Sequence, residues 1–177
     1  MDLFEAIEKR YSYRGQYAGT PVPRADLEKI VRAGLAAPSG CNAQTASVIA
    51  LDDRAVIQQL GALMNKPNFS SAPAAICVLT QPIAAWQGRK FNVQDYAAAI
   101  ENMLLAITAL GYASCWVEGY VTGPDGIGRR MAEQLGVPAG YEVVAYLPVG
   151  VPVSQGARPS YKPFEERAWF NRFGGRD

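Results

Sequence analysis

The chain has 177 residues, of which 49% are hydrophobic and 19% are charged, and its formal net charge is +1. This length predicts one domain with a substantial core, and the excess of apolar over charged residues favours a large subunit interface. A charge so close to neutral excludes the strong field that would attract nucleic acid or anionic lipid.

Several residue types on which catalytic and metal sites depend are scarce. The chain has no histidine, which excludes Ser-His-Asp and Cys-His catalysis and argues against a zinc enzyme. Cys41, Cys77 and Cys115 are far apart, so they form no readable disulfide framework or metal motif. An enzyme of this composition therefore needs a cofactor to carry the difficult chemistry, and no metal is expected.

The longest apolar stretch, Tyr96–Leu110, is interrupted by Glu101 and Asn102, which argues against a membrane span. The first residues, Met1–Glu5, are acidic and amphipathic and do not resemble a signal peptide. We therefore expect a cytoplasmic protein without membrane or nucleic-acid partners.

Periodicity and turn residues predict alternating elements in the first half of the chain. They are a helix over Leu3–Arg10, a helix from about Arg24 to the Pro38–Gly40 turn, a strand over Ser47–Leu51, a helix over Ala55–Met64 and a loop over Lys66–Pro73. The second helix is amphipathic, with apolar residues at spacings of three and four.

The second half continues the alternation, and we expect an α+β fold in which helices layer a sheet. The expected elements are a buried strand over Ala74–Leu79, a surface loop over Pro82–Asn92, a helix over Asp95–Leu110, a strand over Ala113–Tyr120, a helix over Arg129–Leu135 and a strand over Tyr141–Val149. The helix Asp95–Leu110 has hardly any polar face, so it is expected to be buried centrally or against a partner subunit.

Two short segments have the residues of a ligand site. Arg10 and Arg14 flank Ser12, and guanidinium groups suit phosphate oxygens or the edge of an electron-rich ring. The alternative is a pair of surface arginines that compensate a helix dipole. The second segment, Pro38–Gln44, is a tight polar turn that could bring backbone N–H groups to a ligand, or simply an Asx-type helix stop. Together the two segments suggest a binding site for a large anionic cofactor.

Other candidate residues have equally plain structural interpretations. Glu118, at the end of an apolar run, is either a general base or a polar cap of a strand. Arg158 and Lys162 are either solvated charges or distant members of a phosphate site, and Cys41 is expected to be a packing thiol. Gly126-Ile127-Gly128 is not a dinucleotide fingerprint, because no strand precedes it and the third glycine position is Met131.

Four segments, taken together, resemble the FMN-dependent nitroreductase family over essentially the whole chain. They are Ile7–Arg14, Ala37–Gln44, Cys115–Tyr120, and the tail segments Lys162–Glu166 and Phe170–Phe173. The resemblance implies a single FMN-binding domain over residues 1–177, with a central, mainly antiparallel sheet layered by helices. It also implies an intertwined homodimer with two interfacial FMN sites, in which the helix Asp95–Leu110 is the buried dimer helix.

The resemblance implies FMN-binding positions on both subunits. Arg10 and Ser12 would hold the phosphate and ribityl chain, and Arg14 would approach the N1–C2=O edge, where a guanidinium stabilises the charge of reduced flavin. Glu118 and Gly119 would lie beside the ring. The partner subunit would supply Pro38, Ser39, Gly40 and Asn42. The remaining positions are Tyr11, Gln44, Lys66 as a second cation near the ring, and Arg158 or Lys162 at the phosphate.

The implied activity is an FMN-dependent oxidoreductase. NADH or NADPH would pass hydride to the flavin, and a nitroaromatic or quinone-type acceptor would then take the electrons by ping-pong turnover. No side chain is assigned a catalytic role, because FMN carries the chemistry. The alternatives are a relative with other flavin chemistry, such as reductive dehalogenation or flavin breakdown, and a flavin-binding dimer without physiological turnover. Thr45-Ala46 replaces a Pro-Trp pair found in many members, so the acceptor stays open.

Overall fold

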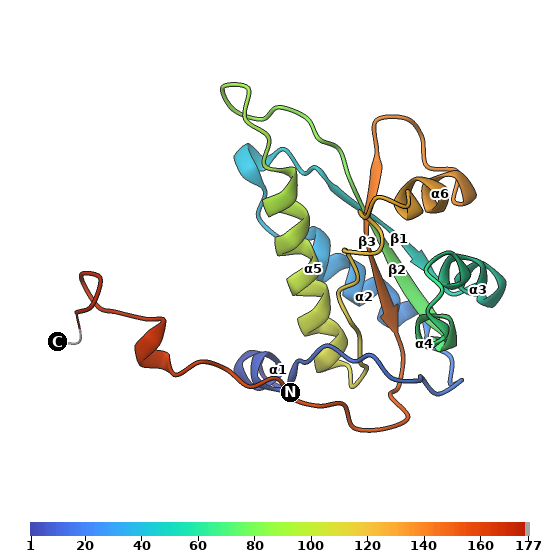
Figure 1. Ribbon diagram of the computed structural model, residues 1–177, viewed down its shortest axis with the longest axis horizontal. Helices are drawn as coiled ribbons and strands as arrows, with labels where there is room; N and C mark the ends of the chain where they lie inside the picture. The colour runs from blue at the N-terminus through green and yellow to red at the C-terminus, as the bar shows by residue number, and fades with distance from the viewer. Residues whose placement is uncertain (176–177) are drawn as a thin grey trace.

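A three-stranded antiparallel sheet forms the centre of the structure, a computed structural model in which residues 1–175 are described (Figure 1). Its strands are β1 (Ala46–Leu51), β2 (Ala74–Thr80) and β3 (Glu142–Val149), with β2 in the middle. Cys77 on β2 pairs with Ile49 of β1 and with Tyr146 of β3. Every residue of β2 is buried, which explains why this strand is an almost continuous apolar run.

Helices cover both faces of the sheet (Figure 1). They are α1 (Leu3–Lys9), α2 (Arg24–Leu35), α3 (Arg54–Leu63), α4 (Pro67–Ser71), α5 (Asn92–Ala109) and α6 (Ile127–Gln134), with the short 3-10 helices η1 (Gly40–Asn42) and η2 (Phe164–Glu166). Helices α2 and α5 pack on one face, and α3, α4 and α6 pack on the other. The expected α+β class with an antiparallel sheet is thus confirmed.

The alternation of side chains along β2 divides the core into two halves. Ile76 and Val78 point to the α2–α5 side, where they meet Ile100 and Met103. Their neighbours Ala75, Cys77 and Leu79 point to the other side, toward α3 and α6. The sheet is therefore buried on both faces, and the open surfaces available for a ligand lie at its edges and around the ends of the helices.

Helix α5 is the longest element, and three candidate segments contact it, through Arg10, Gly40 and Glu118. Its 18 residues span about 27 Å. Residues that face the sheet are buried, whereas Glu101 is exposed and much of the outward side is only partly covered. The predicted apolar helix is confirmed, with its start three residues earlier than expected, at Asn92. In the single chain it is buried on one side only.

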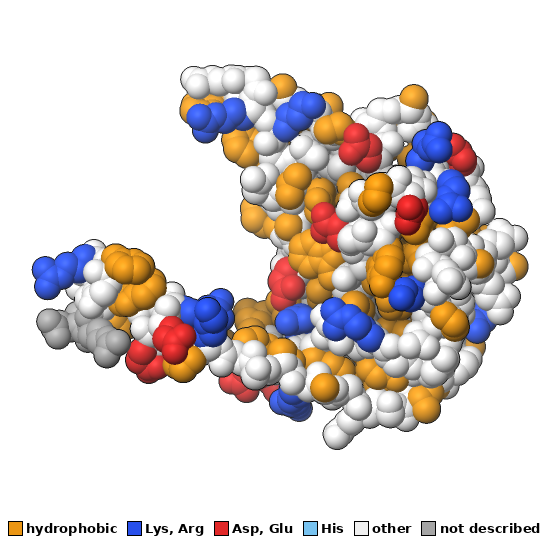
Figure 2. Space-filling model, in the orientation of Figure 1, with side chains coloured by type: hydrophobic (Ala, Val, Ile, Leu, Met, Phe, Trp, Pro, Cys, Tyr) orange, Lys and Arg blue, Asp and Glu red, His pale blue; other side chains and the backbone are white. Residues whose placement is uncertain are grey.

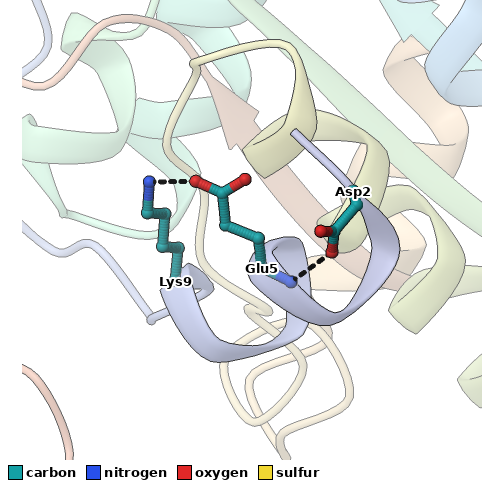
Figure 3. A network of polar contacts seen from close by, with 3 residues as sticks. All are labelled: Asp2, Glu5 and Lys9. Carbon is teal, nitrogen blue, oxygen red and sulfur yellow. Dashed lines mark hydrogen bonds and ion pairs between the residues drawn. The ribbon is translucent and has the colours of Figure 1, made fainter.

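Helix α1 is short and has a well-defined beginning and end. Asp2 is its N-cap and accepts a hydrogen bond of 2.9 Å from the Glu5 backbone N–H, while Lys9 and Glu5 form an ion pair one turn apart (Figure 3). The helix ends at Lys9, and Arg10 leaves it with an extended backbone. The segment that begins at Arg10 can therefore run on as an extended chain beside the rest of the domain.

Two sequence predictions are wrong in detail. The predicted loop Lys66–Pro73 contains α4, which starts at Pro67, because proline is well suited to the first turn of a helix. The predicted strand Ala113–Tyr120 is an irregular extended segment, joined to Gly150, Ser12 and Tyr146 only by isolated bridges. Its apolar pattern reflects burial of Cys115 and Val117 in the core on the α3–α6 side of the sheet rather than membership of a ladder.

The chain after β3 leaves the domain as a tail, drawn in red in Figure 1. Most of residues 157–173 are exposed, including the aromatic side chains of Tyr161, Phe164, Phe170 and Phe173. The other predicted helices and strands are confirmed to within about three residues at their ends. Over the described part of the chain, no helix combines the length and apolar character needed to cross a membrane.

Candidate functional site

The segment Arg10–Arg14 is held in place by the irregular stretch that follows α5. Ser12 pairs with Ser114 in a parallel bridge, and the Tyr13 backbone N–H donates to the Ser114 carbonyl at 2.8 Å. Arg10 Nε lies 3.4 Å from Glu101 Oε1 on α5. These contacts fix the backbone of the segment, while the Arg14 side chain remains exposed.

Buried tyrosines anchor the segment from the inside. Tyr13 is almost fully buried, its ring packs edge-on against Tyr17 at 5.0 Å, and its hydroxyl donates to the Gln16 carbonyl. Burial raises the pKa of Tyr17 well above its usual range, so this hydroxyl stays protonated. Tyr11 packs at the edge of the same cluster, 6.3 Å from Tyr13. The Tyr11 side chain is therefore part of the support of the segment.

Arg14 and Lys66 line one pocket of about 260 Å³. Its other lining residues are Pro67, Asn68, Phe69 and Tyr120. The Lys66 ammonium lies 4.9 Å from the centroid of the Tyr120 ring, and Asn68 Nδ2 donates to the Arg14 carbonyl at 2.8 Å. Within residues 1–175, neither cation has a carboxylate at ion-pair distance. The pocket thus combines two uncompensated positive charges with aromatic walls.

A second, adjoining hollow of about 250 Å³ is lined by Arg14, Phe69 and residues 115–120, which include Glu118 and Gly119. The structure therefore brings together four of the predicted positions: Arg14, Lys66, Glu118 and Gly119. Sequence reasoning missed the aromatic walls, Phe69 and Tyr120. Tyr120 could have been found from its place directly after Glu118-Gly119, whereas nothing in the sequence indicated Phe69.

The Glu118 carboxylate is engaged by two donors. Oε1 accepts from the Tyr96 hydroxyl at 2.8 Å, and Oε2 accepts from Trp116 Nε1 at 2.9 Å. Burial, together with the hydrogen bond to Glu118, raises the pKa of Tyr96 to about 12. Of the two alternatives left by the sequence, the structural one describes this side chain better, because both oxygens bind α5 and the neighbouring indole.

The Pro38–Gln44 segment lies beside the N-terminus of α5, where η1 is drawn in light blue in Figure 1. Pro38, Ser39 and Gln44 line a separate pocket of about 280 Å³ together with Asp95 and Ala99. In the part of the chain that the structure describes, this pocket and the Arg14–Lys66 pocket have no lining residue in common. A single chain therefore does not bring the Arg10–Arg14 and Pro38–Gln44 segments together into one binding site.

Four backbone N–H groups of the turn are already used within the chain, which leaves fewer of them for a ligand than the sequence suggests. The N–H groups of Gly40, Asn42, Ala43 and Gln44 all donate within the chain, to Asp95 Oδ1, Ser39 O, Gly40 O and Ser39 Oγ respectively. The side chains of Asn42 and Gln44 are exposed, and both residues have positive φ angles, 54° and 48°. What the turn offers a ligand is therefore chiefly amide side chains.

Arg158 and Lys162 lie in the exposed tail, away from both pockets of the same chain. At Gly156 the chain still lies against the Arg10–Arg14 segment, because a Cβ there would overlap the Tyr11 ring. Beyond it the tail projects from the body, and Figure 2 shows an open hollow between the tail and the rest of the molecule. Cys41 is exposed rather than packed, so the expectation of a packing thiol is wrong.

The fold and the site define an α+β protein with a pocket that combines two cationic side chains with aromatic walls. The model of the nitroreductase family matches residues 7–69 and 52–151, so the chain belongs to the nitroreductase family. A relative from Archaeoglobus fulgidus, provisionally named NADH dehydrogenase/NAD(P)H nitroreductase, is 31% identical over 152 residues, which cover 85% of this chain and 86% of the relative.

Two solved structures show the same fold. A BluB-like flavoprotein from Clostridium difficile is 26% identical, with a TM-score of 0.83 and coverage of 97% of this chain and 100% of that one. A protein provisionally named NADH oxidase from Clostridium acetobutylicum is also 26% identical, with a TM-score of 0.78 and coverage of 94% and 99%. The similarity therefore extends over nearly the whole of each chain.

Proposed function

We propose that the protein is a homodimeric, FMN-dependent NAD(P)H oxidoreductase that reduces nitroaromatic or quinone-type acceptors. The observation that carries the proposal is the pair of uncompensated cations, Arg14 and Lys66, in one pocket with Phe69 and Tyr120. Membership of the nitroreductase family and the provisional name of the Archaeoglobus relative support it.

The residues of this pocket fit part of an FMN molecule. Guanidinium and ammonium groups suit the electron-rich edge of a flavin, and aromatic walls suit its flat ring. Complete ligand pockets usually enclose about 300–1,000 Å³. The Arg14–Lys66 pocket of about 260 Å³ adjoins the hollow of about 250 Å³ beside Glu118 and Gly119, so the two offer a ligand one continuous surface.

Each segment of the chain then has a defined task. Arg10 and Ser12 would hold the phosphate and ribityl chain of FMN, and the ion pair with Glu101 would orient the Arg10 guanidinium for this contact. Arg14 and Lys66 stabilise negative charge at the ring edge, a preorganised electrostatic contribution. Bound FMN supplies the two-electron exchange with NAD(P)H and the acceptor. The chain itself binds and orients the reactants, and it needs no histidine to do so.

The second subunit would supply the Pro38–Gln44 half and the tail cations. Two features of the single chain support a dimer. Leu3 and Phe4 of α1 are 61% and 76% exposed, and a largely apolar hollow of about 290 Å³ lies between α1 and α5. The tail carries four exposed aromatic side chains that its own domain does not cover. Such apolar surface is typical of an obligate interface.

The visible absorption spectrum of the purified protein tests flavin binding. We expect a yellow protein, or one that becomes yellow with added FMN and bleaches when NADH or NADPH is added without oxygen. Parallel lines in double-reciprocal plots with a nitroaromatic or quinone would establish ping-pong turnover. A colourless protein that takes up no FMN would disprove the proposal.

A second candidate function is a flavoprotein with other flavin chemistry, such as reductive dehalogenation or flavin breakdown. It is favoured by the similarity to a solved structure whose name specifies a flavoprotein and no electron acceptor. A yellow protein that NAD(P)H does not bleach would support this alternative. The replacement of Pro-Trp by Thr45-Ala46 next to the turn also allows it.

A further inference from the structure

The turn Ser39–Gln44 contains three residues with positive φ angles, a backbone conformation that is unfavourable for most residues other than glycine. Cys41, Asn42 and Gln44 have φ angles of 53°, 54° and 48°, in the left-handed region. Asparagine tolerates this region, but cysteine and glutamine are uncommon there. A backbone of this kind persists only where surrounding contacts hold it, so the contacts of the turn decide its geometry.

One buried carboxylate supplies the contacts that connect the turn to the core. Asp95 is 3% exposed and lies in the first turn of α5. Its Oδ1 accepts from the Gly40 N–H at 2.7 Å, and its Oδ2 accepts from the Thr45 hydroxyl at 2.6 Å. Thr45 is itself 1% exposed. The two oxygens of one side chain thus bind both ends of the turn.

Two further features make this arrangement rigid. The carboxylate lies near the N-terminus of α5, where the helix dipole stabilises negative charge. Phe91, which precedes the helix, packs against Gly40 so closely that a Cβ there would lie 2.5 Å from the Phe91 side chain. The start of α5 therefore holds the turn by a carboxylate on one side and an aromatic ring on the other.

We propose that Asp95 is a positioning residue that, through Gly40 and Thr45, holds the turn Ser39–Gln44 in the geometry in which its Asn42 and Gln44 amides meet the flavin bound by the partner subunit. The part of this inference that concerns flavin rests on the proposed function. The part that concerns the turn rests only on the contacts of Asp95. Asp95 touches no ligand itself and acts through the turn.

Thr45 offers the most conservative way to test the inference. Thr45→Val removes the hydroxyl and keeps the shape, whereas Thr45→Ser keeps the hydroxyl. Thr108→Val is a matched control, because the Thr108 hydroxyl donates to the Leu104 carbonyl elsewhere in α5. Asp95→Asn is a second variant for use where Thr45→Val does not fold, since it removes the charge and keeps the shape.

The measurements are hydrogen exchange of the FMN-free protein and titration with FMN. We expect Thr45→Val to speed exchange of the Gly40 and Gln44 amides by about tenfold and to weaken FMN binding by about tenfold, as the loss of a hydrogen bond to a charged group requires. Thr45→Ser and Thr108→Val should stay within about twofold of the wild type.

Two results would overturn the inference. One is unchanged exchange in the turn with Thr45→Val; the other is a loss of protection spread evenly over the sheet, which would give Thr45 a general structural role. If the wild type binds no FMN, the proposed function fails, and the exchange measurement still decides whether Asp95 holds the turn.

Discussion

The Lys66 ammonium lies 4.9 Å from the centroid of the Tyr120 ring, so the residue before α4 contacts the segment that follows Glu118-Gly119. A cation above an aromatic face is stabilised without a carboxylate partner. This contact leaves the positive charge of Lys66 available to an anionic ligand. Since Arg14 lines the same pocket, two charges from distant parts of the chain act on one small volume.

Removing the guanidinium of Arg14 should weaken flavin binding. We expect Arg14→Ala to raise the dissociation constant of FMN about tenfold, because a charge-assisted contact to the ring edge is lost. Quenching of flavin fluorescence on binding measures it. Arg130→Ala, on the exposed side of α6, is the control and should change nothing. Equal affinities of Arg14→Ala and wild type would show that Arg14 is only a surface charge.

Neutralising Lys66 should have a smaller effect that depends on salt. Lys66→Met keeps an apolar stem over Tyr120 and removes the charge, so we expect FMN binding about fivefold weaker at low ionic strength, with the difference shrinking as salt screens the interaction. The exposed Lys29 on α2 provides the control variant Lys29→Met. A difference that does not respond to salt would indicate a change in shape rather than in charge.

Titration of Tyr96 should lower the free energy of unfolding at high pH. Its pKa is raised from 10.0 to about 12 by burial and by its hydrogen bond to Glu118, so the folded state keeps the proton that the unfolded state loses. The stabilisation is complete below pH 10 and is lost as the pH rises toward 12, at about 1.4 kcal/mol per pH unit for one proton. Denaturant unfolding of Tyr96→Phe between pH 10 and 12 should therefore show a shallower decline than wild type. Parallel declines would mean that Tyr96 titrates normally.

The helices and strands with a clear hydrophobic period could be predicted from the sequence. Strand β2 is an example, because prolines lie just outside it and its whole length is buried, and so is helix α5, whose apolar run ends before Gly111. The segment 113–120 shows where this reasoning fails. Its apolar residues are buried as in a strand, but it meets its neighbours only at isolated bridges, and periodicity does not report hydrogen-bond pairing.

The candidate site could be predicted only in part. Arg14 and Glu118-Gly119 stand in segments that resemble the family, Lys66 is a position that the resemblance implies, and the structure brings them together. The sequence indicates only that Asp95 stands at the start of a helix, whereas in the structure it is buried and binds the Gly40 N–H, 55 positions earlier in the chain. Such a contact depends on how α5 packs, which no local pattern in the sequence describes. The other hydrogen bonds of the turn, to the Ser39 and Gly40 carbonyls and the Ser39 hydroxyl, are local and agree with the Asx-type alternative that the sequence offers.

The exposed face of α1 should govern dimerisation. Phe4 is 76% exposed in the single chain, so Phe4→Glu should leave the fold of the monomer intact while placing a charge in the proposed apolar interface. We expect the dimer dissociation constant to rise at least tenfold in sedimentation analysis, with FMN binding lost in proportion. Gln59→Glu, an exposed position on α3 at the other face of the sheet, is the control. An unaffected dimer would place the interface elsewhere.

Gly128 should matter for stability and not for flavin binding. It is buried at the start of α6, and a Cβ there would lie 2.6 Å from the Val143 carbonyl oxygen and 2.9 Å from that of Val121. These are backbone atoms that cannot turn aside, so we expect Gly128→Ala to lower the free energy of unfolding by about 1–3 kcal/mol. Gly19→Ala is the matched control, because a Cβ at Gly19 would meet nothing within 4 Å. FMN affinity at a temperature where both variants are folded should equal that of wild type. A specific loss of FMN binding with Gly128→Ala would contradict this prediction and indicate that Gly126-Ile127-Gly128 binds a ligand.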